Sequence, residues 1–343
     1  MILGSALSRT TRLLLRPTLS PSASSSFFAA ASTTRRSYTM ASALQSPLFT
    51  QQVVQAMRSL YPEELADRAW DNVGLLQENI EPFPATNVPS TVLLTNDLTV
   101  LVAEEAIRKK ASVIVTYHPF IFRGLKSVTL ADPQQRILLQ LAQNNIAVYS
   151  PHTAVDAAPG GMNDWLADML NGHGVTTKRT VVQPISGLVP SGFAGAGYGR
   201  VVEFGHPVNL GRIVEAYAAG LGGLRYVMVA TPKHNGASPV PVRTVAVCAG
   251  SGYDVLKDSG ADLFVTGEMT HHNALRLTML GKSVITVFHT NSERRFLKAR
   301  LQPQLQAVLR EQDADARVLV SEEDADPFEI WDVENMPAWA YDR

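Results

Sequence analysis

Ile137–Asp156 (ILLQLAQNNIAVYSPHTAVD) and Ala274–Glu293 (ALRLTMLGKSVITVFHTNSE) align with each other without a gap. Each stretch predicts the end of a helix, a short polar turn, an apolar β-strand and then a His-Thr-x-x-acid motif. The preceding segments, Ser112–His118 and Asp262–Glu268, match more loosely. Repeats of this size usually represent one supersecondary unit used twice. The sequence therefore predicts an α/β protein with two similar α/β lobes that arose by internal duplication.

Both copies of the repeat end in side chains that bind metals. His152 and Asp156 fall opposite His289 and Glu293 in the alignment. These imidazoles and carboxylates follow predicted strands, and open α/β sheets bind ligands at the C-terminal ends of their strands. We therefore expect a metal site between the two lobes, with Asp156 and Glu293 approaching each other.

The chain divides into four expected regions. Residues 1–40 stand apart in composition, 45–186 form the first α/β lobe, 187–241 contain linker loops around a small β-α-β element, and 242–343 form the second lobe and a C-terminal tail. Strands alternate with helices in both lobes, which is typical of parallel βαβ units. The expected strands are 91–95, 112–116, 146–149, 200–204, 225–230, 245–249, 263–266 and 284–288, and the expected helices are 47–61, 100–110, 133–144, 161–170, 210–221, 253–259, 272–280 and 293–309.

Composition limits the function classes. The 343 residues are 45% hydrophobic and carry a formal net charge of −1, so no basic excess exists for direct nucleic-acid binding. No apolar run reaches the roughly 18 residues of a membrane span. The single cysteine, Cys248, lies in an apolar run that predicts a buried strand. One cysteine cannot form a disulfide or a multi-thiolate zinc site, so nitrogen and oxygen must hold any metal.

Residues 1–40 have the composition of a mitochondrial transit segment. They contain five arginines, many Ser, Thr and Ala, and no acid, and the first acidic residue of the chain is Glu63. We expect mitochondrial import and cleavage of this segment, and a cytoplasmic form that starts at Met40. The alternative is an untargeted extension.

Metal candidates stand at four predicted strand ends. They are His118, Asp156, Glu268 and the pair His289 and Glu293, with His152 nearby. Metal-assisted hydrolysis requires two or three imidazoles or carboxylates that converge on an ion with an open coordination position.

Two of these features also have simpler explanations. Asp156 and Glu293 could instead interact with the positive end of a following helix. Gly250-Ser251-Gly252 follows a strand and could bind an anion or form a plain tight turn.

Five motifs follow one another along the chain: Trp70-Asp-Asn-Val-Gly74, Thr116-Tyr-His-Pro119, His152-Thr-Ala-Val-Asp156 with Gly161-Met-Asn-Asp164, Thr266-Gly-Glu268 and His289-Thr-Asn-Ser-Glu293. With these motifs the chain resembles the Nif-three-like family, the GTP cyclohydrolase 1 type 2 homologues, over residues 48 to 335. The resemblance implies two similar α/β lobes, a binuclear metal centre and a homo-oligomer, often a hexameric ring.

The resemblance also implies roles for single residues. The metal ligands carried over are His118, Asp156, His289 and Glu293, and Glu268 and His152 become candidate proton-transfer or ligand-orienting groups. Tyr117 stands where the family commonly has the first histidine of a His-His pair. A phenolate is a costlier ligand than a neutral imidazole, since the tyrosine pKa is about 10. We expect an asymmetric centre, in which His118 and Asp156 serve a tight ion and His289 serves a weaker one beside Tyr117.

Three functions are compatible with these residues. The first is a metal-dependent hydrolase that acts on a nucleotide or another small phosphorylated compound, with two divalent ions chosen among Zn, Mn, Fe and Ni. The second is an interaction protein, because the resemblance also implies binding to a transcriptional adaptor. The third is metal handling without catalysis.

Overall fold

The computed structural model describes residues 46–80, 89–233 and 240–336, which form a mixed α/β fold with two β-sheets. The proposed transit segment, residues 1–40, lies outside the described residues. No helix in the described ranges has the length and apolar character needed to cross a membrane. The helices are α1 (Leu48–Leu60), α2 (Val100–Arg108), α3 (Pro133–Gln143), α4 (Thr153–Ala157), α5 (Met162–Asp168), α6 (Leu210–Gly220), α7 (Tyr253–Leu256), α8 (His271–Met279), α9 (Arg294–Phe296) and α10 (Gln302–Arg310).

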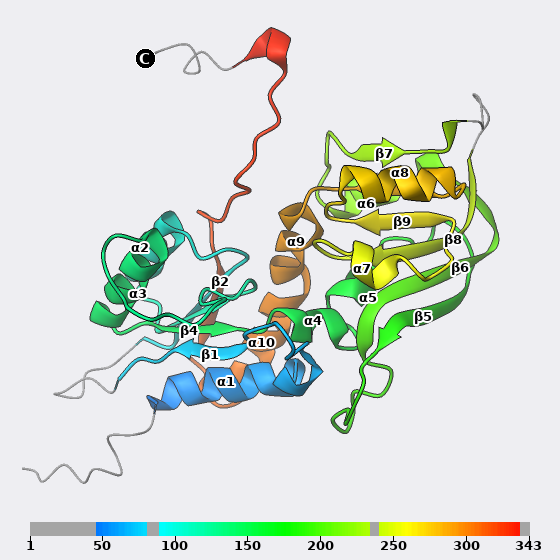
Figure 1. Ribbon diagram of the computed structural model, residues 1–343. Helices are drawn as coiled ribbons and strands as arrows, with labels where there is room; N and C mark the ends of the chain where they lie inside the picture. Colours follow the sequence, from blue (N-terminus) through cyan, green and yellow to red (C-terminus); the bar gives the residue numbers. More distant parts are fainter. Residues whose placement is uncertain (1–45, 81–88, 234–239, 337–343) are drawn as a thin grey trace, which may run out of the picture. The chain divides into compact units, whose positions relative to one another are not determined.

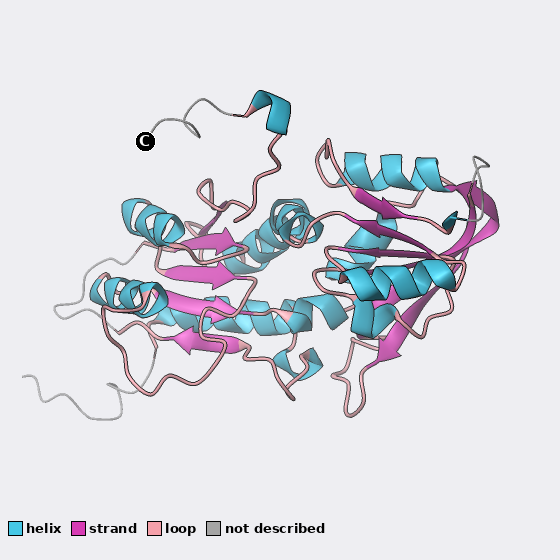
Figure 2. Ribbon diagram, turned by 45° about the horizontal axis from the view of Figure 1, so that its top comes forward, coloured by secondary structure: helices cyan, strands magenta, loops and turns pink. Residues whose placement is uncertain are grey.

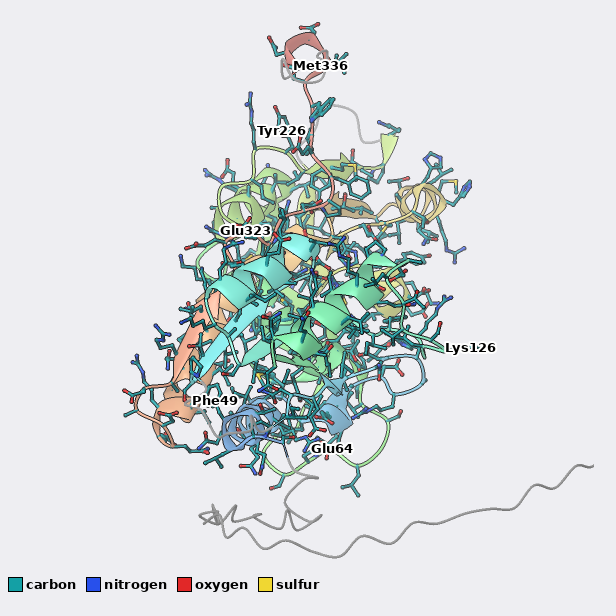
Figure 3. All side chains as sticks on the ribbon, turned by 90° about the vertical axis from the view of Figure 1, so that its left-hand side faces the viewer. Phe49, Glu64, Lys126, Tyr226, Glu323 and Met336 are labelled. Carbon is teal, nitrogen blue, oxygen red and sulfur yellow. The ribbon has the colours of Figure 1, made fainter. Side chains whose placement is uncertain are left out.

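The first sheet has five strands in the order β1-β4-β3-β2-β11 (Figure 1). They are β1 (Gly74–Gln77), β2 (Thr91–Thr95), β3 (Val113–Thr116), β4 (Ala147–Ser150) and β11 (Arg317–Val320). All neighbouring pairs are parallel except β1 with β4. Helices α2 and α3 lie side by side over one face (Figure 3), and α1 and α10 pack together against the other.

The second sheet has six strands in the order β5-β6-β8-β9-β10-β7 (Figure 2). They are β5 (Thr176–Pro184), β6 (Gly197–Asn209), β7 (Met228–Ala230), β8 (Pro241–Cys248), β9 (Leu263–Thr266) and β10 (Ser283–Thr286). The central strands β8, β9 and β10 are parallel, whereas β5, β6 and β7 are antiparallel to their neighbours.

A continuous apolar core joins the inner faces of the two sheets. It contains Val115 and Tyr149 of the first sheet together with Val247 and Ile285 of the second. Separate clusters fill the space between the first sheet and α2–α3, and between the second sheet and α7–α8. Because each sheet is covered on both faces, its central strands are buried at every position and show no strict alternation of buried and exposed side chains. Cys248 is buried in β8, as predicted.

The alternating elements expected from sequence are confirmed within a few residues, but three strands were missed. Strands β1 and β11 are the two edge strands of the first sheet, and β5 is an edge strand of the second sheet whose side chains are all partly or fully exposed. These strands lack the apolar pattern that marks a central strand. Two of these strands also join the sheet on the other side of an expected lobe boundary. Strand β5 precedes residue 187 yet joins the second sheet, and β11 follows residue 242 yet joins the first.

A buried ion pair ties α5 to β6, and we expect its loss to destabilise the protein strongly. Arg200 donates to both carboxylate oxygens of Asp164 at 2.8 Å and to the carbonyls of Gly197 and Gly199. Removing Arg200 takes away the main partner of the Asp164 carboxylate, which keeps only a longer contact with Arg179 at 3.7 Å and a hydrogen bond from the Gly160 amide. Arg200→Ala should therefore lower the free energy of unfolding by about 3 kcal/mol in urea titrations. Arg212→Ala, which breaks an exposed pair with Glu215, should cost less than about 1 kcal/mol.

The same pair predicts a pH dependence of stability. Burial alone would raise the pKa of Asp164, but the hydrogen bond and charge of Arg200 lower it overall. A lowered pKa in the folded state means that this contribution is complete above the unfolded pKa of about 3.9 and is lost as the pH falls through the folded value. The stability difference between wild type and Arg200→Ala should therefore shrink only below about pH 4. A constant difference down to the acid transition would contradict this explanation.

Candidate metal centre

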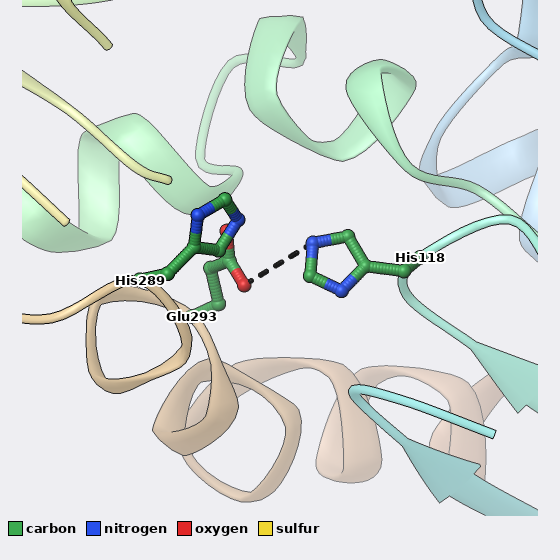
Figure 4. Close-up of side chains that lie close together, drawn as sticks. All are labelled: His118, His289 and Glu293. Carbon is green, nitrogen blue, oxygen red and sulfur yellow. Dashed lines mark ion pairs between the residues drawn. The ribbon is translucent and has the colours of Figure 1, made fainter. Parts of the chain in front are cut away.

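Three side chains from the two sheets converge at the C-terminal ends of their strands. His118 follows β3, His289 follows β10, and Glu293 begins the turn into α9 (Figure 4). His118 Nε2 lies 3.5 Å from Glu293 Oε2, and His289 Nε2 lies 3.3 Å from Glu293 Oε1. One ligand atom from each residue lies within 4.8 Å of the others, close enough for all three to bind a single ion.

Carboxylates orient three histidine rings at the site. Their Nδ1 atoms lie 2.8 Å from Asp97 Oδ1 for His118, 2.7 Å from Asp71 Oδ1 for His152, and 3.1 Å from Glu268 Oε1 for His289. With Nδ1 held this way, each ring is left with Nε2 as its free ligand atom. Metal-binding histidines in proteins almost always have such a partner, which fixes the tautomer and increases ligand basicity.

The charges at the centre are mutually stabilising. The hydrogen bond with Glu293 raises the pKa of His289 to about 9. Burial alone would lower the pKa of His118, but the hydrogen bond that the ring donates to Asp97 and the charge of Glu293 raise it overall. The carboxylate of Glu293 is only 2% exposed and accepts a further hydrogen bond from Asn96 Nδ2 at 3.1 Å. A buried carboxylate between two imidazoles is suited to a cation, which would replace the protons on the rings.

Tyr117 and Asp156 form a separate pair in the same region. The Tyr117 hydroxyl donates to Asp156 Oδ1 at 2.8 Å. Burial, followed by the charge of Asp156, raises the pKa of Tyr117 well above its usual value, so the side chain stays a phenol. Burial also raises the pKa of Asp156 to about 6.

The structure therefore differs from the expected pairing of ligands. His118 lies close to His289 and Glu293, whereas the hydroxyl of Tyr117 donates a hydrogen bond to Asp156. Adjacent residues at the end of β3 point to different partners, which the order of residues in the sequence does not reveal.

Backbone strain marks the strand-to-helix junctions of both motifs. His152 has φ +30° and Phe288, which precedes His289, has φ +69°. Residues other than glycine rarely adopt positive φ, and such strain collects at functional sites.

Gly250 brings the backbone directly against the candidate ligands His289 and Glu293. Its φ is +58°, and a Cβ there would lie 2.8 Å from Glu293 Oε1 and 3.1 Å from His289 Nε2. We expect Gly250→Ala to displace both ligand atoms and to reduce metal affinity more than stability, since glycine-to-alanine strain at positive φ costs only about 1–2 kcal/mol. Metal retention and urea unfolding, measured on the same preparation, check this. Gly260→Ala, where φ is +71° and no atom lies within 4 Å of the added Cβ, is the matched control.

Two cavities meet at the centre. One, of about 740 Å³, is lined by Tyr117, His118, His152, Asp156, His289 and Glu293 together with an aromatic and polar wall. The other, of about 830 Å³, shares His118 and His289 with the first and adds Glu268 and residues 325–330. Among the residues that the structure describes, no lysine or arginine lines either cavity. All seven candidate residues named from the sequence therefore face one or both cavities, and Asp156 and Glu293 line the same one.

The two simpler explanations have different outcomes. Asp156 lies in the first turn of α4 and Glu293 is the N-cap residue of α9, so both carboxylates stand at the positive end of a short helix, although Glu293 makes no side-chain capping hydrogen bond. The amides of Gly250 and Gly252 already donate to Ser292 Oγ and Thr266 Oγ1, which supports a tight turn at this motif. Neither amide is available for an anion.

Sequence reasoning missed Asp71, Asp97 and Asn96. Asp71 is part of the quoted Trp70–Gly74 motif, and Asn96 and Asp97 directly follow β2. A search of every strand end for carboxylates and amides would have found the last two. Asp71 carried no signal of this kind, because it lies in a loop before β1.

Comparisons with known proteins identify the family of this chain and support its fold. The family model described as Duf34/NIF3 (NGG1p interacting factor 3) matches residues 49–327. Protein NIF3 homolog of Schizosaccharomyces pombe is 47% identical over 275 residues, which cover 80% of this chain and 95% of the relative. NGG1-interacting factor 3 of Saccharomyces cerevisiae is 40% identical over 285 residues, with coverages of 81% and 96%. The structure of a Bacillus cereus protein related to NIF3 superposes with a TM-score of 0.67 at 23% identity and covers 82% of this chain and 98% of that protein, which supports the fold.

Proposed function

Because the chain belongs to the Duf34/NIF3 family, we propose that it binds a divalent metal ion through His118, His289 and Glu293 and acts as a metal-dependent hydrolase. The observation that carries the proposal is the convergence of these three ligand atoms, each histidine being oriented by its own carboxylate. Two imidazoles and a carboxylate form a donor set suited to Zn²⁺ and also to Mn, Fe or Ni. A second ion would lie beside Asp156, where Tyr117 makes binding weaker.

The internal duplication is part of the same proposal. Strands β2, β3 and β4 with α2 and α3 correspond in order and direction to β8, β9 and β10 with α7 and α8. Each unit ends in a His-Thr-x-x-acid motif that faces the 740 Å³ cavity. This correspondence supports a centre assembled from two copies of one ancestral unit.

Two further residues have distinct roles in hydrolysis. A bound divalent ion supplies a water of lowered pKa and polarises the bond to be cleaved. His152, held by Asp71, can accept a proton from the attacking water at Nε2 and pass it to the leaving group, while Asp71 stabilises the protonated ring. Glu268 contacts His289 Nδ1 and Ser251 Oγ, so it is better placed to position His289 than to carry protons.

The substrate class follows from the cavity walls. A nucleotide or another small phosphorylated compound fits a cavity of this size. Since none of the described lining residues is a lysine or an arginine, a bound metal ion would supply the main positive charge for a phosphate. A screen of nucleotides and simple phosphate esters with the metal-loaded full chain tests the hydrolase. Turnover that disappears in both His152→Asn and His289→Ala supports it, and turnover that survives both contradicts it.

A second candidate function is protein binding, since the Saccharomyces cerevisiae relative is named NGG1-interacting factor 3. Phe328, Ile330 and Val333 expose apolar side chains on the C-terminal segment. If partner binding is the main role, substitution of these residues by serine should abolish binding of the partner, and His289→Ala should leave that binding intact. Metal handling without catalysis remains the third candidate, favoured if the ion exchanges freely and the screen finds no substrate.

We also propose a homo-oligomer, up to a hexamer. Leu275, Met279 and Leu280 expose apolar side chains on and beside α8, and β7 is an edge strand with Met228 and Val229 exposed. Large exposed apolar side chains that lie together mark interaction surfaces. Light scattering of the full chain and of Met279→Glu tests this, and a wild-type monomer would refute it.

Mitochondrial targeting is proposed from residues 1–40, whose five arginines and lack of acid suit import. A fluorescent fusion of the full chain should reach mitochondria, whereas a fusion that starts at Met40 should stay in the cytoplasm. The same distribution for both fusions would refute targeting.

A further inference from the structure

The outer part of the 740 Å³ cavity has an aromatic wall that the proposed hydrolysis does not explain. Trp70 is 52% exposed and Phe122 is 45% exposed, yet both line the cavity. Their ring centroids are 6.0 Å apart, and Trp70 lies edge-on to His152 at 5.7 Å. His152 is in turn 5.5 Å from His118, and His118 is 5.4 Å from His289. A continuous run of rings therefore leads from the mouth of the cavity to the metal candidates.

The indole of Trp70 is hydrogen-bonded despite its exposure. Its Nε1–H donates to Asp67 Oδ2 at 2.9 Å, and the backbone amide of Asp67 donates to Thr153 Oγ1 at 3.1 Å. An exposed tryptophan held in one orientation loses apolar burial and side-chain freedom without an evident gain in stability. A ligand that covers the ring would account for both costs.

The chemistry of the remaining walls narrows the ligand. Asp67 and Asp254 supply carboxylates, Gln183 and Tyr198 supply polar groups, and Val255 supplies an apolar surface. Carboxylates accept hydrogen bonds from amino groups, and the lack of any lysine or arginine disfavours an anionic group in this part of the cavity. Tryptophan binds flat π-systems by stacking, at about 1–3 kcal/mol per nucleobase.

We propose that Trp70 and Phe122 form a subsite for a planar, uncharged nitrogen heterocycle that carries amino groups. The inference rests on the proposed function for the orientation of the bound compound. The ring binds at the mouth of the cavity, and its substituent extends past His152 to the proposed ligands His118, His289 and Glu293. The aromatic wall then binds the ring, and the metal binds any phosphate, in separate parts of one cavity.

The test uses 2-aminopurine, a heterocycle whose fluorescence falls on stacking and which carries no phosphate. Titration with the full-length protein should give saturable quenching. Trp70→Ala should weaken binding about 5- to 100-fold, as expected for the loss of one stacking partner. Phe122→Ala should weaken it less, and Trp70→Phe, which keeps an aromatic face, should restore most of the affinity. Phe328→Ala, an exposed aromatic residue of the other cavity, should bind like the wild type.

The controls separate this inference from the hydrolase proposal. Binding should persist in chelator-treated protein and in His289→Ala, so it stands even if no hydrolysis is found. Ribose 5-phosphate should not displace the probe from metal-free protein. No saturable quenching by the wild type, unchanged affinity in Trp70→Ala, or an equal loss in Phe328→Ala would each overturn the subsite, whatever the outcome of the activity screen.

Discussion

Glu293→Gln should remove nearly all tightly bound metal. The Glu293 carboxylate lies within 3.5 Å of both His118 Nε2 and His289 Nε2, so it is the one side chain that completes the three-residue group. The amide keeps the size of the side chain but removes the charge that a cation needs. Metal content per chain after dialysis against a mild chelator should fall to background, with the circular dichroism spectrum unchanged.

Glu268→Gln is the matched control for that experiment. Glu268 contacts His289 from the outside, and loss of such a partner usually costs about 10- to 100-fold in metal affinity. Its effect should therefore be clearly smaller than that of Glu293→Gln. Equal effects of the two substitutions would mean that Glu293 is not a ligand, and retention of metal by Glu293→Gln would remove it from the site.

Tyr117→His should add metal-binding capacity. In the wild type the Tyr117 hydroxyl occupies Asp156 Oδ1, and burial keeps the tyrosine protonated. A histidine at this position would release that oxygen and add an imidazole, giving a second cation its own ligands beside the first. We expect the variant to retain more metal per chain than the wild type under the same dialysis.

Tyr117→Phe separates the two consequences of that change. Phenylalanine releases Asp156 Oδ1 but brings no ligand, so it should give little or no gain. If Tyr117→Phe gains as much metal as Tyr117→His, the tyrosine hydroxyl alone blocks the second ion. If neither variant gains metal, Tyr117 does not determine the asymmetry of the centre.

The central strands of both sheets were predictable because burial on two faces makes them continuous apolar runs. Strands 91–95 and 263–266 match the structure to the residue. The edge strands were not predictable in this way. The exposed strand β5 is determined by antiparallel pairing with the next strand, β6, and β11 by pairing with β2, which lies far away in the sequence.

The site shows the same limit at the scale of single residues. The duplicated His-Thr-x-x-acid motif identified His289 and Glu293, because ligand spacing within one turn is a local property. The partners of Tyr117 and His118 depend on how the two sheets meet. Reasoning from sequence order therefore paired Asp156 with His118, whereas Asp156 accepts a hydrogen bond from Tyr117. Asp71, which orients His152 from a loop 81 residues away, is likewise a product of tertiary structure.

The most direct test is an anomalous-scattering map of crystals of the full chain loaded with Zn²⁺. The proposed centre predicts the strongest peak between His118 Nε2, His289 Nε2 and the carboxylate of Glu293, with a weaker peak or none beside Asp156 and Tyr117. A strongest peak beside Asp156 with nothing at His289, or zinc bound only elsewhere, such as at the exposed His271–His272 pair, would contradict it.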